Sequence, residues 1–245
     1  MKAVIFDCDG VLVDTERDGH RVAFNRAFQA LGIDADWDVP LYGELLFVAG
    51  GKERMRAYFD RFGWPEGRTE SRDELIAALH KKKTEIITDM LSSGQLPLRP
   101  GIRRIVDEAI AAGVRLGVCT TSAQKAIDGV LDLFGPERKA KFEFVHAGDV
   151  VSRKKPDPEI YELAKTSLGL PVSECIVIED SRNGLLAATG AGLPCLITMS
   201  AYTTEEDFTE AVGVVSELGD SPNAQVTLDD LARFASKHAA SKAAV

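Results

Sequence analysis

The sequence has no surplus of positive charge: its 245 residues carry a formal net charge of −9. Nucleic acids and anionic membrane surfaces bind basic surfaces, so this charge balance argues against either as a partner. An anionic small molecule is still compatible with the composition, because it needs only a local cluster of positive groups.

Long apolar runs and metal-binding pairs of cysteine or histidine are missing as well. No stretch approaches the roughly 18 apolar residues that span a bilayer. The four cysteines form no C-x-x-C pair and the four histidines no H-x-x-x-H pair, which argues against zinc and favours buried thiols in a reducing compartment. A strand-like segment begins at Ala3 with neither a signal peptide nor a transit segment before it. We expect a protein that stays where it is made, or a mature form without its leader.

Hydrophobic residues make up 45% of the chain, enough to build a core. Short apolar runs with little alternation are typical of strands buried on both faces. Segments with helical spacing lie between them. This alternation predicts an α/β fold with a doubly wound parallel sheet. The predicted strands are 3–6, 115–119, 142–145, 175–178, 194–197 and a weaker 212–215, and the predicted helices are 102–112, 122–134, 158–168 and 181–191.

One long segment breaks the alternation of strands and helices. Its apolar spacing predicts helices at 17–31, 40–47, 52–62 and 72–91, and no strand. We therefore predict an all-helical domain, residues 16–96, inserted after the first strand of a core formed by residues 1–15 and 97–236. The small and polar residues 237–245 predict a flexible tail.

Acidic and hydroxyl side chains follow three of the predicted strands. Asp7 and Asp9 follow the first strand, Thr120 the second and Asp180 the fourth, while Lys155 precedes a helix after the third. In a parallel sheet these ends meet at one crevice, where ligands bind. Crowded carboxylates with hard oxygen ligands favour Mg²⁺.

These residue types suit phosphoryl transfer. Asp7 would attack phosphorus to give an aspartyl-phosphate, and Asp9 would protonate the leaving oxygen and later activate water. Thr120 and Lys155 would hold the phosphoryl oxygens. Each pattern alone has an ordinary explanation as a loop, a helix cap or a turn. Their joint occurrence, in order and at strand ends, favours a catalytic site.

The same residues resemble the haloacid dehalogenase (HAD) superfamily over essentially the whole chain. The first family motif is matched from Ala3 to Thr15 by an apolar run, Asp7-Cys8-Asp9-Gly10, a second apolar run and Asp14-Thr15. The later motifs are matched by Thr120, by Lys155-Pro156 and by Glu179-Asp180-Ser181 with Asn183-Gly184. The resemblance implies a Rossmann-like core with a C1-type helical cap. It also implies Mg²⁺ bound by the Asp7 side chain, the Asp9 carbonyl and Asp180. Glu179 would be either a further ligand or a residue that contacts the ligands without binding the ion.

Two other activities occur on folds of this kind. A dehalogenase has no need of an acid at Asp9, so this aspartate favours phosphoryl chemistry. A phosphonate hydrolase needs a Schiff-base lysine in the cap; Lys52 is a candidate for it, but the other features point elsewhere.

The cap contains Gly50-Gly51-Lys52-Glu53-Arg54 at the start of a predicted helix. It is not a Walker loop, because position 46 is leucine and no hydroxyl residue follows Lys52. A glycine turn with Lys52 and Arg54 at a helix start is nevertheless a good anion cradle, although it also fits a flexible turn with surface charges. A second anion site beside a phosphatase centre favours a bisphosphate substrate.

Within the superfamily the chain resembles the CbbY-type branch. The segments that carry this resemblance are Asp14-Thr15-Glu16, His20-Arg21, Trp37-Asp38, Tyr42 to Leu46, Gly50 to Arg54, Leu98 to Gly101 and Ala147-Gly148-Asp149. The segment Phe6 to Glu16, with Asp18 to Arg21, resembles plant and algal members in particular. That resemblance implies a phosphatase that converts xylulose 1,5-bisphosphate, a Rubisco inhibitor, to xylulose 5-phosphate. It implies substrate contacts from Glu16, His20, Gly50, Gly51, Lys52, Glu53, Thr121 and Ser122.

The branch also implies a cellular compartment, an oligomeric state and a class of partner. We expect the plastid stroma or, for a bacterial protein, the cytoplasm, with a chloroplast leader absent from this chain. We expect a monomer that takes a small sugar bisphosphate, with neither nucleic acid nor membrane as partner. Two alternatives are open: a sugar phosphomutase of the β-phosphoglucomutase type, in which a sugar hydroxyl replaces water, and a non-catalytic protein on the same fold.

Overall fold

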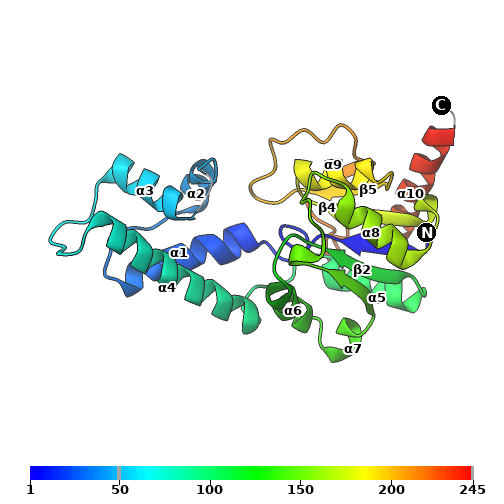
Figure 1. Cartoon of the computed structure of the whole chain (residues 1–245). Coiled ribbons are helices and arrows are strands. Elements are labelled where there is room, and N and C mark those ends of the chain that lie inside the picture. The colour runs from blue at the N-terminus through cyan, green and yellow to red at the C-terminus, as the bar shows by residue number, and fades with distance from the viewer. Residues whose placement is uncertain (49–50, 244–245) are drawn as a thin grey trace. The chain divides into compact units, whose positions relative to one another are not determined.

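The computed structural model describes residues 1–48 and 51–243 (Figure 1). It divides the chain into two compact units. The first comprises Met1–Asp14 and Leu96–Val245, and the second is Thr15–Gln95. The boundaries fall within one residue of those that the sequence pattern predicts.

The first unit is built on one six-stranded sheet in the order β3-β2-β1-β4-β5-β6, in which every neighbouring pair is parallel. This confirms the predicted doubly wound sheet. Because β1 is flanked by β2 and β4, the segments after these three strands emerge side by side. The strands are β1 (Ala3–Phe6), β2 (Arg115–Cys119), β3 (Phe142–His146), β4 (Cys175–Glu179), β5 (Cys195–Thr198) and β6 (Gly213–Val215).

Helices cover both faces of this sheet. Alternate residues of the central strands, such as Ile5 and Val177, pack in one buried cluster with α8 (Glu159–Leu168) and α9 (Arg182–Gly190). The opposite face is covered by α5 (Ile102–Ala111) and α10 (Leu228–Ala243), which contact β2 and β4 respectively. Burial on both faces explains why the strand sequences are continuously apolar. The remaining helices are α6 (Gln124–Asp132), α7 (Pro136–Lys139) and the 3₁₀ turns η2 (Gly148–Val150) and η3 (Val172–Glu174).

Helix α10 begins at Leu228 and continues to Ala243, through most of the segment 237–245 that the sequence predicts as a flexible tail. That segment includes several alanines, and alanine has the highest intrinsic helix propensity. The flexibility of these residues stays a prediction.

Among the described residues of the second unit, 15–48 and 51–95, every regular element is a helix. The unit starts with a short π-helix, η1 (Thr15–His20), and continues with α1 (Arg21–Ala30), α2 (Val39–Leu45), α3 (Gly51–Phe62) and α4 (Arg72–Ser92). Ser71 and Glu74 form a reciprocal capping box that starts α4. Gly50, a predicted substrate residue, lies outside the described residues.

Aromatic side chains form the core of the second unit. Trp37 is fully buried, and its ring lies 4.6 Å from that of Phe24 and 5.0 Å from that of Phe28. Phe28 also packs edge-on against Phe59, at 6.0 Å. Such large rings contribute most of the area that this small unit buries.

We predict that Phe28→Ala destabilises the second unit by about 3–5 kcal/mol, because it removes a fully buried ring from this cluster. The chain's two tryptophans, Trp37 and Trp64, both lie in that unit, so tryptophan fluorescence during urea unfolding reports on it directly. Phe47→Ala is the matched control. Phe47 is 94% exposed, and its loss should change the free energy of unfolding by less than about 0.5 kcal/mol. Equal effects of the two substitutions would contradict this account of the core.

Candidate active site

The polar residues predicted at the strand ends come together in the first unit. Asp7 directly follows β1, and its amide donates to the carbonyl of Ile178 in β4. Thr120 follows β2, and Asp180 follows β4. Around them lies a pocket of about 220 Å³. Its lining residues are Asp7, Asp9, Thr121, Lys155, Glu179, Asp180, Ser181 and Asn183.

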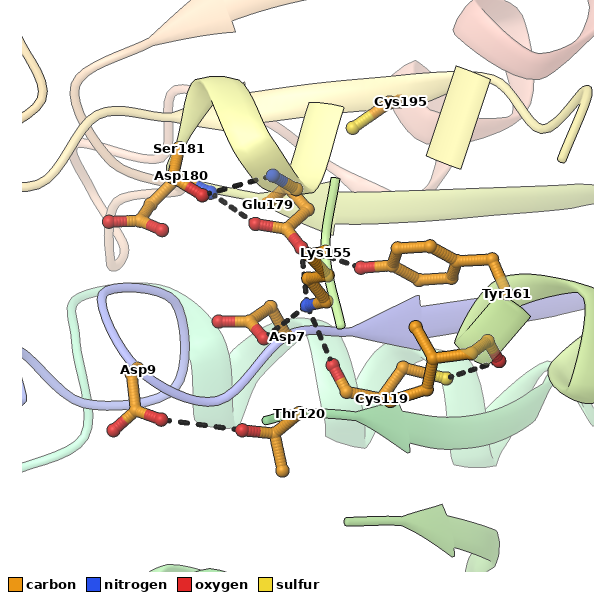
Figure 2. A network of polar contacts seen from close by, with 12 residues as sticks. Asp7, Asp9, Cys119, Thr120, Lys155, Tyr161, Glu179, Asp180, Ser181 and Cys195 are labelled. Carbon is orange, nitrogen blue, oxygen red and sulfur yellow. Dashed lines mark hydrogen bonds and ion pairs between the residues drawn. The ribbon is translucent and has the colours of Figure 1, made fainter. Parts of the chain in front are cut away.

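Lys155 is the centre of the polar network in this pocket (Figure 2). Its Nζ lies 2.6 Å from Asp7 Oδ1, 2.6 Å from Glu179 Oε1 and 3.0 Å from the carbonyl oxygen of Cys119. Burial by itself lowers the pKa of the Lys155 ammonium, but Asp7 and Glu179 raise it, and the net shift is upward. The ammonium is therefore held in the charged form beside Asp7.

Glu179 is fixed by three donors and is almost completely buried. Besides Lys155, the hydroxyl of Tyr161 donates to Glu179 Oε1 at 2.6 Å, and the amide of Asp180 donates to Oε2 at 3.2 Å. Gly184 allows this placement, since a Cβ there would lie 2.1 Å or less from the Glu179 carboxylate. The Glu179 side chain is thus packed to orient Lys155.

Three carboxylates meet beside this lysine: single oxygens of Asp7, Glu179 and Asp180 lie within 4.8 Å of one another. Burial, chiefly, raises the pKa of the Asp7 carboxyl from 3.8 to about 8; Lys155 opposes the shift, while Glu179 and Asp9 add to it. Burial also raises the pKa of Asp180, helped by Glu179 and Asp7 and opposed by the hydroxyl of Ser200 and the charge of Arg99. Crowding and burial therefore disfavour the ionised carboxylates unless another positive charge is present.

The Asp9 carboxylate faces a different part of the pocket, as Figure 2 shows. Its Oδ2 accepts hydrogen bonds from the hydroxyls of Ser122 and Thr120, the latter at 3.3 Å. The Thr120 hydroxyl accepts in turn from the Ser122 amide at 3.1 Å. Two residues predicted for phosphate and substrate binding therefore also fix the direction of Asp9.

Within the second unit, Glu16 is held by a tyrosine and an arginine in series. The hydroxyl of Tyr42 donates to Glu16 Oε2 at 2.6 Å, and Arg54 donates to the Tyr42 oxygen at 2.9 Å. Glu16 lies in the π-helix η1, a rare geometry that is frequent at functional sites.

Positive groups gather near the start of α3 in the same unit. Lys83 Nζ lies 2.9 Å from His20 Nδ1, and burial lowers the pKa of Lys83 to about 8, with Glu16 opposing and Arg54 assisting. A Cβ on Gly51 would lie 3.3 Å from the His80 ring. Burial lowers the pKa of His80, and so do the charges of Lys52 and Lys83. Lys52 and Glu53 are exposed.

Comparison with known proteins places the chain in a family. Residues 1–192 match the family model of the haloacid dehalogenase-like hydrolases. A CBBY-like protein of Arabidopsis thaliana is 50% identical over 230 residues, which cover 92% of this chain and 72% of that protein. The chain belongs to the haloacid dehalogenase-like hydrolases.

Two solved structures of CbbY from Rhodobacter sphaeroides carry the similarity further. One, in complex with phosphate, is 39% identical with a TM-score of 0.68, covering 94% of this chain and 99% of that one. The other is a mutant in complex with xylulose-(1,5)bisphosphate, 38% identical with the same TM-score and coverage. The chain is thus a HAD hydrolase with CbbY-like homologues, and its activity class is that of a phosphoric monoester hydrolase.

The acidic cluster of this hydrolase suits a hard divalent cation. Carboxylate oxygens are the preferred ligands of Mg²⁺, and the three buried carboxylates outnumber the one ammonium among them. Asp7 and Asp180 would hold such an ion. Glu179 also belongs to the cluster, but its hydrogen bonds to Lys155 and Tyr161 favour an orienting role.

Several polar residues of these sites escaped the sequence-based reading. Tyr161 lies one helical turn into α8 and reaches Glu179, and Ser200 follows β5 and reaches Asp180. A signal existed for Ser200, because it too follows the carboxyl end of a strand. Lys83 gave none, since 63 positions separate it from His20.

We predict that Mg²⁺ binds more tightly as the pH rises from 6.5 to 8.5. The pKa of Asp7 is about 8 in the folded protein and 3.8 in the unfolded chain. The contribution of this carboxyl to folding stability is therefore fully present below the unfolded pKa and is lost as the pH rises through about 8. The cation binds the deprotonated carboxylate and restores the loss. Titration calorimetry in two buffers of different ionisation enthalpy should show proton release at pH 6.5 that diminishes at pH 8.5.

An exposed aspartate provides the control for this titration. Asp132→Asn removes a carboxylate paired with Lys139 at the surface and should leave both affinity and proton release unchanged. A Mg²⁺ affinity that is equal at the two pH values, with no proton release, would refute the buried-carboxylate site.

Proposed function

We propose that this hydrolase is a Mg²⁺-dependent phosphatase that removes the 1-phosphate of xylulose 1,5-bisphosphate through an aspartyl-phosphate on Asp7. The observation that carries the chemistry is the buried set of Asp7, Lys155 and Asp180 at the ends of β1 and β4. The similarity to a CbbY that binds this bisphosphate supports the choice of substrate. The product would be xylulose 5-phosphate, and the reaction would remove a Rubisco inhibitor.

Each of four residues of the first unit has a defined role in phosphoryl transfer. A carboxylate oxygen of Asp7 attacks phosphorus, and the bond to the sugar oxygen breaks as Asp9 gives that oxygen a proton. Lys155 and Thr120 hold the phosphoryl oxygens, where they oppose the developing charge. Asp9, now ionised, takes a proton from the water that attacks the aspartyl-phosphate. Phosphate leaves and both aspartates are restored.

A bound Mg²⁺ would bring the anionic substrate and the Asp7 carboxylate together by screening their charges. Its ligands would be the side chains of Asp7 and Asp180 with the backbone carbonyl of Asp9. Glu179 would stay behind these ligands, where it orients Lys155.

We assign catalysis to residues 1–15 with 97–236 and substrate recognition to a cap of residues 16–96. Glu16, held by Tyr42, is suited to accept hydrogen bonds from sugar hydroxyls. Gly51, Lys52, Glu53 and His20 are the remaining described cap residues assigned to the substrate, and Thr121 and Ser122 are those of the core. Burial chiefly lowers the pKa values of His80 and Lys83, but the charges of Lys52 and Lys83 add to the shift at His80 and that of Arg54 to the shift at Lys83. This gathering of positive groups favours a second phosphate.

The proposal also covers the cellular compartment and the oligomeric state. Relatives in a plant and in bacteria support action in the plastid stroma or in a bacterial cytoplasm. No helix among the described residues is long and apolar enough to cross a membrane. We propose that the protein acts as a monomer on a small molecule.

We predict that the protein releases inorganic phosphate from xylulose 1,5-bisphosphate only with Mg²⁺, and that Asp7→Asn lowers this rate by at least about three orders of magnitude, because an amide is no nucleophile. Asp132→Asn, at the surface, should keep the full rate. A substrate panel with ribulose 1,5-bisphosphate and β-glucose 1-phosphate completes the experiment. Conversion of β-glucose 1-phosphate to glucose 6-phosphate without phosphate release would instead establish a phosphomutase. Activity retained by Asp7→Asn would refute the mechanism.

We predict that Lys52→Ala raises the KM for xylulose 1,5-bisphosphate about tenfold and changes that for p-nitrophenyl phosphate, which has one phosphate, by less than about twofold. A tenfold change corresponds to about 1.4 kcal/mol, which is of the order of one hydrogen bond to a charged group. Arg56→Ala, on the same helix α3, removes an equal charge that is paired with Asp73 at 2.9 Å and should leave both KM values unchanged. Equal effects of Lys52→Ala on the two substrates would show that this cluster does not bind the second phosphate.

A further inference from the structure

Arg99 lies where the chain returns to the first unit, beside the turn that follows β1. Its amide donates to the carbonyl of Leu12 at 2.9 Å, and Leu98 bridges Val13 in antiparallel fashion. In the sequence, Leu98 to Gly101 is one of the segments that resemble the CbbY-type branch. The structure places its arginine next to the catalytic turn Asp7–Gly10.

The guanidinium of Arg99 joins three segments that follow strands of the sheet. It donates to the carbonyl of Gly10 after β1, to those of Thr198 at 3.0 Å and Met199 at 2.6 Å at the end of β5, and to that of Ser216 after β6 at 2.8 Å. A planar guanidinium has five N–H donors in a fixed arrangement, so it can satisfy several carbonyls at once. Lysine, with three donors on one nitrogen, cannot reproduce this set.

Two of these segments enclose the Asp180 carboxylate. The backbone of Gly10 passes so close to it that a Cβ would lie 2.0 Å from Asp180 Oδ2, and Gly10 adopts a φ of +84°. Ser200 directly follows Met199, and its hydroxyl lies near enough to Asp180 to lower the pKa of that carboxyl. The amide of Ser200 is fixed in turn by Thr203 at 2.9 Å. Arg99 therefore holds the two segments that lie beside this carboxylate.

We propose that Arg99 is a positioning residue of the metal centre, which fixes the Gly10 turn and the segment 198–200 on either side of Asp180 and so sets the direction of that carboxylate toward the cation. The inference deepens the proposed function and rests on its assignment of Asp180 as a ligand. Groups that orient metal ligands typically change metal affinity by about 10–100-fold when they are lost.

The test is titration of the substrate-free protein with Mg²⁺, followed by calorimetry and by the rise in melting temperature. We expect Arg99→Gln to weaken Mg²⁺ binding about tenfold or more, and Arg99→Lys to weaken it less. In turnover assays the Mg²⁺ concentration for half-maximal rate should rise by the same factor, while kcat at saturating Mg²⁺ stays within about threefold. A purely structural role would lower the melting temperature without changing the affinity for the ion.

Arg104 offers a matched control in the same unit. Its guanidinium also donates to backbone carbonyls, those of Leu218, Gly219 and Val226, none of which supports Asp180. Arg104→Gln should cost stability and leave the Mg²⁺ affinity within about twofold of the original. Should Arg99→Gln fail to fold, Arg99→Lys and Ser200→Ala carry the test, since Ser200→Ala removes one support of Asp180 and spares Arg99.

Three outcomes would overturn the inference: unchanged Mg²⁺ affinity in the folded Arg99 variants, unchanged affinity in Ser200→Ala, or an equal loss in Arg104→Gln. The proposed function is tested separately. A protein that binds Mg²⁺ as described, but releases no phosphate from xylulose 1,5-bisphosphate, would refute that function and keep the role of Arg99. A protein that binds no Mg²⁺ would refute both.

Discussion

The buried ammonium of Lys155 is the interaction on which the active site depends. It is 8% exposed and lies 2.6 Å from a carboxylate oxygen of Asp7 and from one of Glu179. Removing such charges from water costs several kcal/mol per ion, and only close pairing with further hydrogen bonds offsets that cost. Tyr161 and the Cys119 carbonyl supply those hydrogen bonds. Asp180 is the third carboxylate of the cluster, and with one ammonium among three carboxylates a divalent cation is the natural counter-charge.

The sheet determines where this charge cluster forms. Parallel pairing of β1 with both β2 and β4 brings Asp7, Thr120 and Asp180 to one edge. Close backbone approach then completes the cluster: Gly10 packs against Asp180, and Gly184 against Glu179. At both positions a side chain would overlap a carboxylate, so the glycines are needed for the site as much as the acids are.

Much of this arrangement followed from the sequence alone. The strands and the helix alternation were predicted because their apolar runs are long enough to report burial, and Asp7, Thr120 and Asp180 were found because each directly follows such a run. Residues whose role arises from distant contacts gave no comparable signal. Arg99 reaches Thr198 and Met199 from about a hundred positions away, and the hydroxyl of Ser122 turns toward Asp9. Local patterns report what a segment buries, whereas these contacts exist only once the sheet has formed.

The core chemistry by itself does not choose a substrate, because any phosphate ester that reaches Asp7 meets the same groups. Selectivity must therefore come from groups that contact the rest of the molecule. In the second unit Glu16 is fixed through Tyr42 and Arg54, while the positive charges of Lys52 and Lys83 both act on His80, in a chain whose net charge is −9. One fixed carboxylate beside several cations suits a polyol with a second phosphate better than a neutral or singly charged ester. Under the proposed mechanism, water and a sugar hydroxyl would meet the same aspartyl-phosphate on Asp7, so a phosphatase and a phosphomutase would differ in the acceptor and not in the nucleophile.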